Sequence, residues 1–230
     1  MEKLIPLFIL LPLLGFLVSL FIPRSNERLQ SGFVIGTVVL YLAGFLAFTI
    51  NWLLVGYPVL DIKFLPLYQT PDFEFIISFY FDMVTAVYLF VGAVITFTIV
   101  VFSKYYLHRE EGFKRFFNTL LLFFLGFNLV VLSGNFETLF TGWEFVGISS
   151  FLLIAFYRDR YLPVKNALKV ISVYRLGDIA LILAMWMSHH FWHENITFLK
   201  LNDATAVATQ LAAHPGAAIF ISPDCTLILK

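Results

Sequence analysis

The sequence predicts an all-α fold, a polytopic bundle of about six transmembrane helices with its N-terminus outside, and three observations support this prediction. The chain of 230 residues is 60% hydrophobic and only 13% charged, whereas soluble domains have about 25% charged residues. Several apolar segments reach the ~20 residues needed to cross ~30 Å of hydrocarbon. Lysine and arginine gather in alternate connecting segments, as they do in cytoplasmic loops. The net charge of zero gives no reason to expect a nucleic-acid partner.

Six segments have the length and polarity of membrane spans. In chain order they cover about residues 4–22, 32–54, 83–103, 116–135, 138–157 and 170–188. The first resembles a signal peptide because Lys3 precedes it, but its uncharged run exceeds the ~7–15 residues of a signal peptide's apolar region. We therefore interpret it as a retained span. The first four spans carry no charged side chain, which sets the last two apart.

The connection between the second and third spans, residues 55–82, has its own pattern. It contains three prolines and the alternating stretch FEFIISFYF, which predicts a short interfacial strand or hairpin. Asp82 stands where the third span begins. An acidic residue at a helix start is favoured by the helix macrodipole, and a role in proton conduction is the alternative interpretation.

The distribution of basic residues predicts the orientation. One side of the membrane would hold ten of them, namely Arg24, Arg28, Lys104, Arg109, Lys114, Arg115, Arg158, Arg160, Lys165 and Lys169. The other side would hold Lys3, Lys63 and Lys200. Because positively charged loops stay in the cytoplasm, this asymmetry places the N-terminus outside.

Three histidines, His189, His190 and His193, cluster with Trp192 beyond the sixth span. They are suited to buffering or relaying protons near an exit, and equally to the headgroup level of a membrane interface. Glu194 is the only carboxylate beside them, so we expect no metal site here.

Residues 201–230 differ from the rest of the chain, because prolines, Gly216 and Asp224 interrupt their apolar stretches and no full span appears. We expect them to be a truncated or frame-shifted tail. Cys225 is the single cysteine, which excludes a disulfide framework and a cysteine-based metal site.

The fifth span carries Glu144 between Gly142 and Gly147, two positions at which a neighbouring helix or water can approach closely. A charge in hydrocarbon costs at least ~2.5–3.5 kcal/mol, so an ionisable residue there indicates a functional site. A carboxyl group with two accessible protonation states is suited to carrying protons. The alternative is a neutral or salt-bridged glutamate that holds two helices together.

The sixth span carries Arg175 and Asp178, whose i, i+3 spacing places them on one helical face. Lys169 lies six residues before Arg175, so Lys165 and Lys169 extend a line of basic residues from the inner surface toward Asp178. The alternative is an internal ion pair, with the two lysines reaching out to the interface.

No other chemistry is indicated by the sequence. It contains no phosphate-binding glycine loop, dinucleotide fingerprint, nucleophile elbow or HExxH motif. We therefore expect neither a cofactor nor a redox site on this chain.

Three stretches carry a family resemblance: NFETLFTGWEFVGISSFLLIAFY at 135–157, KNALKVISVYRLGD at 165–178 and FSKYYLHREEGFKRFF at 102–117. With these the chain resembles the antiporter-like membrane subunits of NADH-quinone oxidoreductase, and most closely the large L-type subunit, the equivalent of mitochondrial subunit five. The Mrp antiporter A subunit and the membrane partner of bicarbonate-accumulating complexes are related to it.

The resemblance implies a site and a function. Glu144 matches the family's glutamate of the fifth helix, and Lys169, Arg175 and Asp178 match charged positions of the sixth. In the family these charges pass protons along a water-filled axis, while redox centres and the quinone site lie on other subunits. Tyr174 departs from the pattern, since many L-type members have asparagine there.

The resemblance also implies about fourteen helices, with a broken seventh helix whose lysine partners the glutamate. No matching segment is present, so we expect residues 1–200 to be the N-terminal part of a proton-conducting membrane domain. The leading hypothesis is a proton-translocating subunit in a bacterial inner membrane, assembled with other membrane subunits. The alternatives are an Mrp-like cation/proton antiporter, a membrane partner for bicarbonate uptake, and a structural scaffold.

Overall fold

The structure, a computed structural model, describes residues 4–69, 74–192, 197–199, 219–221 and 227–229. Its helices are α1 (Leu7–Phe21), α2 (Glu27–Leu54), α3 (Met83–Tyr106), α4 (Phe113–Val131), α5 (Phe136–Ile154) and α6 (Tyr161–Trp192). Its strands are β1 (Leu60–Gln69), β2 (Glu74–Phe81), β3 (Ile219–Ile221) and β4 (Leu227–Leu229). The predicted helix bundle is confirmed, and a helix stands at each of the six predicted segments.

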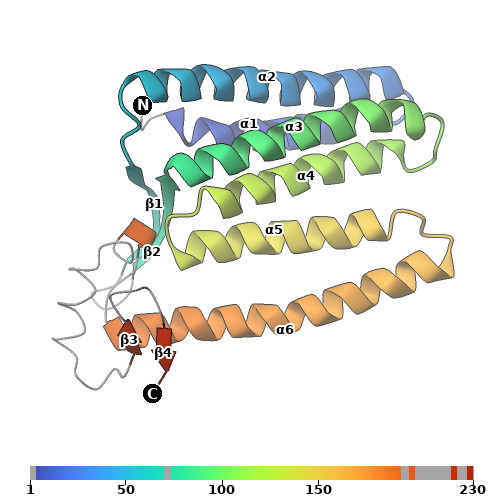
Figure 1. The fold of residues 1–230 in the computed structure, drawn as a ribbon. Coiled ribbons are helices and arrows are strands. Elements are labelled where there is room, and N and C mark those ends of the chain that lie inside the picture. Colours follow the sequence, from blue (N-terminus) through green and yellow to red (C-terminus); the bar gives the residue numbers. More distant parts are fainter. Residues whose placement is uncertain (1–3, 70–73, 193–196, 200–218, 222–226, 230) are drawn as a thin grey trace.

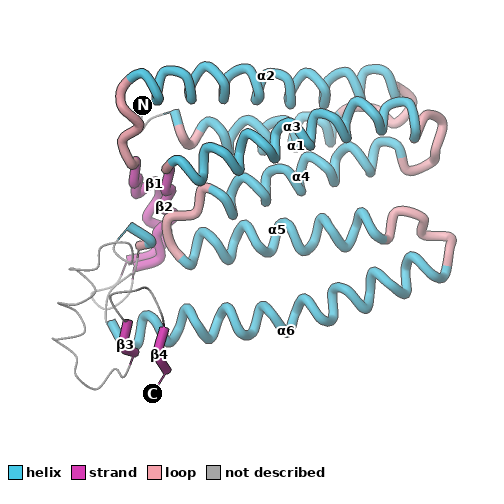
Figure 2. Tube along the Cα trace, viewed as in Figure 1, coloured by secondary structure: helices cyan, strands magenta, loops and turns pink. Residues whose placement is uncertain are grey.

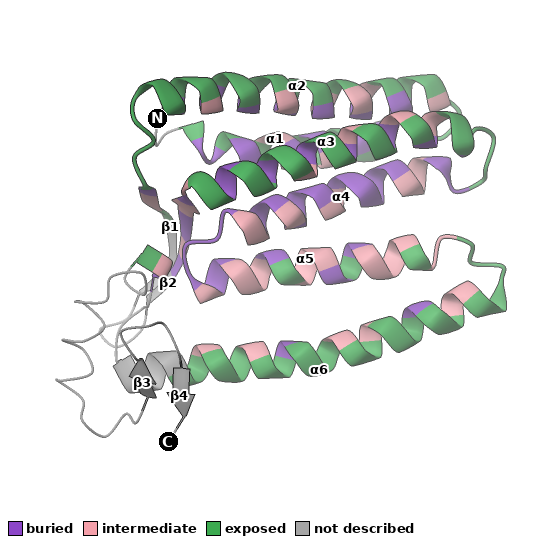
Figure 3. Ribbon diagram, viewed as in Figure 1, coloured by how far each residue is buried: buried purple, intermediate pink, exposed green. Residues whose placement is uncertain are grey.

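Successive helices run in opposite directions. Helices α1 to α4 form one group, α5 lies beneath α4, and α6 lies on the outside (Figure 1). Burial follows this arrangement (Figure 3). Of the most apolar 18-residue stretch of each helix, 56% is buried in α4 and 6% in α6. Two clusters of buried residues form the core. One includes Phe8, Tyr41 and Phe124, and the other includes Val38 and Phe117.

In the described part of the chain, four helices are long and apolar enough to cross a membrane, namely α2, α3, α4 and residues Tyr161–Met187 of α6. The remaining two are α1, with 15 residues, and α5, with 19 residues that include Glu137 and Glu144. The rest of α5 is largely apolar; Glu137 is buried and the Glu144 side chain is 23% exposed.

Helix boundaries differ from the predicted span boundaries where charges flank the apolar run. The sixth span was expected from residue 170, but α6 begins at Tyr161 and takes in Lys165 and Lys169. Lysine is a good helix former, so a loss of hydrophobicity does not end the helix. In the same way α2 begins at Glu27, before the expected start at residue 32.

The connection between α2 and α3 is the predicted hairpin, with β1 antiparallel to β2 (Figure 2). Strand β2 is bound to the α4–α5 connection, because Gly134 N donates to Ser78 O at 2.9 Å and Asn135 Nδ2 donates to Ile76 O at 2.6 Å. Asn135 also caps α5, accepting from Thr138 N at 3.0 Å. The hairpin thereby positions the start of the helix that carries Glu144.

Asp82 has the structural role predicted for it. Its carboxylate accepts from Thr85 N at 2.8 Å and so caps α3. Strands β3 and β4 pair antiparallel in the part of the chain that was expected to be an atypical tail.

Candidate functional site

The charged residues of α5 and α6 face each other across the contact between these helices and form one cluster, Glu144, Arg175 and Asp178. Arg175 Nη1 donates to both carboxylate oxygens of Glu144 at 2.8 Å. The same nitrogen donates to Asp178 Oδ2 at 3.0 Å. In the sequence, Glu144 and Arg175 are 31 residues apart and were treated as parts of two separate sites. The structure brings them together in one site.

The two carboxylates differ in burial and in partners. Asp178 is 4% exposed, and its second oxygen accepts from Trp143 Nε1 at 2.9 Å. The Glu144 side chain is 23% exposed, and within the described part of the chain Arg175 is its only hydrogen-bond partner. Asp178 is therefore anchored twice and Glu144 once.

An aromatic pair supports the cluster from one side. The rings of Trp143 and Tyr174 stack with centroids 4.8 Å apart and planes at 15°, and the Tyr174 hydroxyl donates to the Trp143 carbonyl. Gly147 makes room for this pair, since a Cβ there would lie 2.3 Å from Tyr174 Cε1. Sequence reasoning missed Trp143 altogether and treated Tyr174 only as a departure from a family pattern. Their positions directly before Glu144 and Arg175 were the available signal.

The charge balance of the cluster is incomplete. Two carboxylates and one guanidinium leave one negative charge, and an unbalanced charge in an apolar environment is costly. Binding of a proton or a cation would lower that cost. This is a chemical property of the arrangement and requires no cofactor.

Lys169 is not brought into the cluster. It is exposed and lies beside a shallow hollow with Val170, Val173 and Tyr174, and no ion pair joins it to another described residue. Lys165, one turn earlier, lies over the Tyr161 ring with its Nζ 5.3 Å from the centroid. The expected line of bases therefore reaches only part of the way to Asp178.

The histidine cluster falls outside what the structure describes. His189 and His190 lie in the last turns of α6 without described side chains, and His193 lies beyond the described residues. Within the described residues no group of three His, Cys, Asp or Glu side chains could hold a metal.

Two family models match the chain on either side of the α3–α4 connection. The N-terminus of NADH-ubiquinone oxidoreductase (complex I) chain 5 matches residues 67–117. The transmembrane model of NADH:quinone oxidoreductase and Mrp antiporters matches residues 133–222, which include the whole charge cluster. The chain belongs to this family of antiporter-like membrane subunits. It is accordingly an integral, multi-pass membrane protein.

Relatives with known names agree with this membership. NADH-quinone oxidoreductase subunit L of Rickettsia bellii is 34% identical over 182 residues, which are 78% of this chain and 28% of that protein. NADH-ubiquinone oxidoreductase chain 5 of Felis catus is 34% identical over 154 residues, 60% of this chain and 25% of that protein. The chain thus spans about a quarter of the length of these family members.

A solved structure shares the fold. A chain of the membrane-bound sulfane sulfur reductase, an archaeal respiratory membrane complex, aligns with a TM-score of 0.67 and 19% identity. The alignment covers 91% of this chain and 43% of the other. At this identity the likeness concerns the arrangement of the helices alone.

Proposed function

We propose that this chain forms part of a proton-translocating membrane subunit of an NADH-quinone oxidoreductase-type complex. The carrying observation is that a single nitrogen of Arg175 serves both Glu144 and Asp178. In a medium of low polarity, a movement of Arg175 toward one acid leaves the other without its cation. The carboxylate that has lost its ion-pair partner then binds a proton.

Glu144 is the residue that exchanges the proton in this proposal. Asp178 keeps the hydrogen bond from Trp143 when Arg175 moves, whereas Glu144 keeps no described partner. Arg175 is the moving group, because its side chain is 50% exposed and so has room to leave. Asp178 is the fixed acceptor to which it returns.

Lys169 supplies charge coupling between the basic end of the bundle and the cluster. Six residues of helix separate it from Arg175, a rise of about 9 Å. A proton or a lysine side chain moving within that distance changes the electrostatic potential at Arg175, since charges interact strongly where water is scarce.

The redox chemistry belongs to other subunits in this proposal, and this chain holds no cofactor. Its partners are further membrane subunits, and its location is a bacterial inner membrane. The names of the relatives, which include a bacterial subunit L, support this assignment.

The test uses membrane vesicles containing the complex with Glu144→Gln. We expect NADH oxidation to continue while NADH-driven proton uptake falls at least tenfold. Glu137→Gln is the matched control, since Glu137 lies on the same helix, is 7% exposed and stands outside the cluster. Normal proton uptake with Glu144→Gln would refute the role of Glu144.

A cation/proton antiporter is the second candidate, and it is supported by the Mrp antiporters that share the matching family model. It predicts proton movement driven by a sodium gradient without NADH. A purely structural cluster predicts instead that Arg175→Asp combined with Asp178→Arg restores both assembly and proton uptake. A double variant that assembles but moves no protons excludes that alternative.

A further inference from the structure

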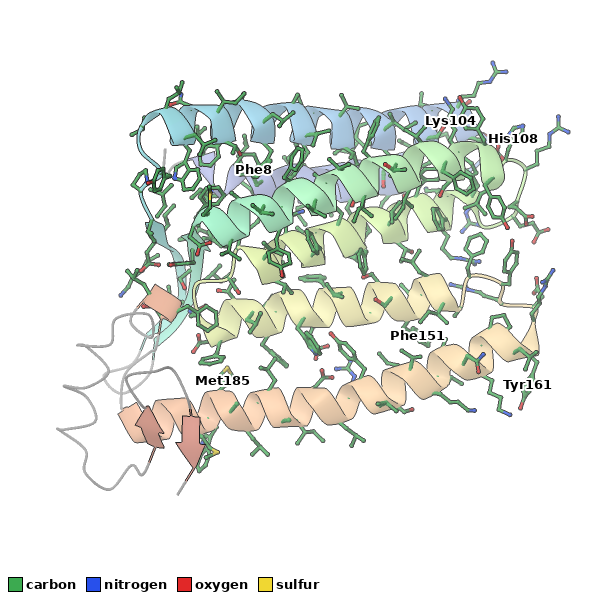
Figure 4. All side chains as sticks on the ribbon, viewed as in Figure 1. Phe8, Lys104, His108, Phe151, Tyr161 and Met185 are labelled. Atoms are coloured by element: carbon green, nitrogen blue, oxygen red, sulfur yellow. The ribbon has the colours of Figure 1, made fainter. Side chains whose placement is uncertain are left out.

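A cavity of about 660 Å³ opens at the end of the bundle that holds the α1–α2, α3–α4 and α5–α6 connections. In Figure 4 this is the end at which Lys104, His108 and Tyr161 are labelled. Five basic side chains line it: Arg24, Arg109, Lys114, Arg115 and Arg158. We propose that this cavity binds the phosphate group of an anionic phospholipid. The inference does not depend on the proposed transport of protons.

The positive charge of the cavity is not neutralised within the described residues. Three acidic side chains, Glu27, Glu110 and Glu111, also line it, so the basic residues remain in excess. Glu27 is already engaged by His108 Nδ1 at 2.8 Å. None of the five basic residues forms an ion pair with any described carboxylate.

Two of the cations are held in place by neutral acceptors. Lys114 Nζ donates to the carbonyls of Leu20 at 2.8 Å and Ile22 at 2.6 Å. Arg115 Nη2 donates to the carbonyl of Phe156 at 2.6 Å. These bonds satisfy carbonyls at the ends of α1 and α5, which is a structural role, but a carbonyl leaves the charge of its donor in place. The cavity is therefore positively charged before any ligand arrives.

Two further features favour an anion. Arg115 Nε is buried and has no hydrogen-bond partner within the described structure. The N-terminus of α4 opens at the same place, and its N-cap, Gly112, offers no side chain to the first backbone N–H groups. A phosphate oxygen satisfies such donors and interacts favourably with the positive end of the helix.

The remaining wall of the cavity distinguishes a lipid from a free phosphate ion. Phe16 and Leu20 of α1, Leu122 of α4 and Leu152 of α5 line it with apolar surface. A phospholipid combines a phosphate with acyl chains that cover such surface, whereas an inorganic ion leaves it exposed. Basic cavities between membrane helices on the cytoplasmic side are suited to anionic headgroups.

The test is thermal unfolding of the full chain in a neutral detergent, titrated with phosphatidylglycerol, with phosphatidylcholine or with inorganic phosphate. We expect a saturable rise in Tm with phosphatidylglycerol and none with phosphatidylcholine. Arg158→Gln and Arg109→Gln should each weaken binding about fivefold, the effect of one cation beside an anionic headgroup. Arg160→Gln is the matched control, since it lies in the same connection as Arg158, stacks on Tyr157 and does not line the cavity.

Arg109→Gly separates binding from folding. Arg109 has φ 69°, a left-handed conformation that glycine adopts without strain, so this variant should unfold at the same or a higher temperature while binding more weakly. If inorganic phosphate raises Tm as much as the lipid does, the cavity binds the free ion. That result overturns the proposal that its ligand is a phospholipid. No saturable rise with either ligand, or equal weakening by Arg160→Gln, overturns the phosphate site itself.

Discussion

Single residues decide how the members of the charge cluster differ from one another. Trp143 is the clearest case, because its indole nitrogen holds the oxygen of Asp178 that Arg175 does not contact. The stacking of its ring on Tyr174 fixes the orientation of that nitrogen. Without this bond Asp178 would depend on Arg175 alone, as Glu144 does, and the two acids would differ only in burial.

We expect Trp143→Phe to lower the free energy of unfolding by about 1.5–3 kcal/mol, the usual range for a hydrogen bond to a charged group. Phenylalanine keeps an aromatic ring beside Tyr174 and removes the indole N–H donor. The measurement is thermal unfolding in detergent. Trp186→Phe is the control for the change from indole to phenyl itself, because Trp186 is 60% exposed on α6 and stands outside the charge cluster. An equal loss of stability in both variants would contradict the importance of the Asp178 bond.

The burial of Asp61 in β1 should make the stability of the protein depend on pH. One of its oxygens is buried without a hydrogen-bond partner among the described residues, and burial raises the pKa of Asp61, while Lys63 opposes the shift. Because the folded state binds this proton more tightly than the unfolded state, stability falls as the pH rises from about 4, the ordinary Asp pKa, through the raised value. We expect Asp61→Asn to remove this fall, so its Tm should exceed that of the parent chain more at pH 7 than at pH 4. Asp159→Asn, at an exposed position of the α5–α6 connection, is the matched control.

At the scale of whole elements, the close approach of α4 and α5 makes the site possible. A Cβ at Gly142 would lie 2.6 Å from the backbone nitrogen of Val130, and one at Gly126 would lie 2.8 Å from Val146 N. These contacts are between backbones, which cannot move aside as a flexible side chain does. Small residues at a helix interface permit such packing in membranes.

We therefore expect Gly142→Ala to destabilise the bundle by about 1–3 kcal/mol, as overpacking does in other interiors. Gly44→Ala on α2 is the matched control, because nothing lies within 4 Å of a Cβ there. It should be neutral or stabilise by up to about 1 kcal/mol through helix propensity. Resistance to unfolding by a denaturing detergent measures both, and equal resistance would contradict a tight α4–α5 contact.

At the scale of the whole molecule, charge separates the two ends of the bundle. Most of the basic residues lie in the connections α1–α2, α3–α4 and α5–α6 or in the helix ends beside them, and the hairpin lies at the opposite end (Figure 1). This asymmetry predicts an orientation with the basic end in the cytoplasm, which also places the proposed phosphate site beside anionic lipids.

Labelling with a membrane-impermeant thiol reagent tests this orientation. In a chain with Cys225→Ser, we expect Asp159→Cys to react only when the reagent reaches the cytoplasmic face. Val59→Cys, at the hairpin end and 52% exposed, should react only from the outside. The reverse pattern would show that the N-terminus lies in the cytoplasm.

Much of the fold was open to prediction from the sequence, because lipid imposes strong rules on it. A span must be apolar and its backbone bonds must close within the helix, so the six helices and the hairpin follow from composition and periodicity. The helix ends were less predictable. Charged residues such as Lys165 end a hydrophobic run without ending a helix.

The sequence by itself determined which residues are costly in a membrane, and it therefore identified Glu144, Arg175 and Asp178. Only the tertiary structure decided that they are one cluster, that Trp143 and Tyr174 belong to it, and that Lys169 stands apart. The reason is physical. The cost of a buried charge depends on residue type and depth, both of which the chain records locally. Which partner relieves that cost depends on distances of a few ångströms between helices, and these are set by packing.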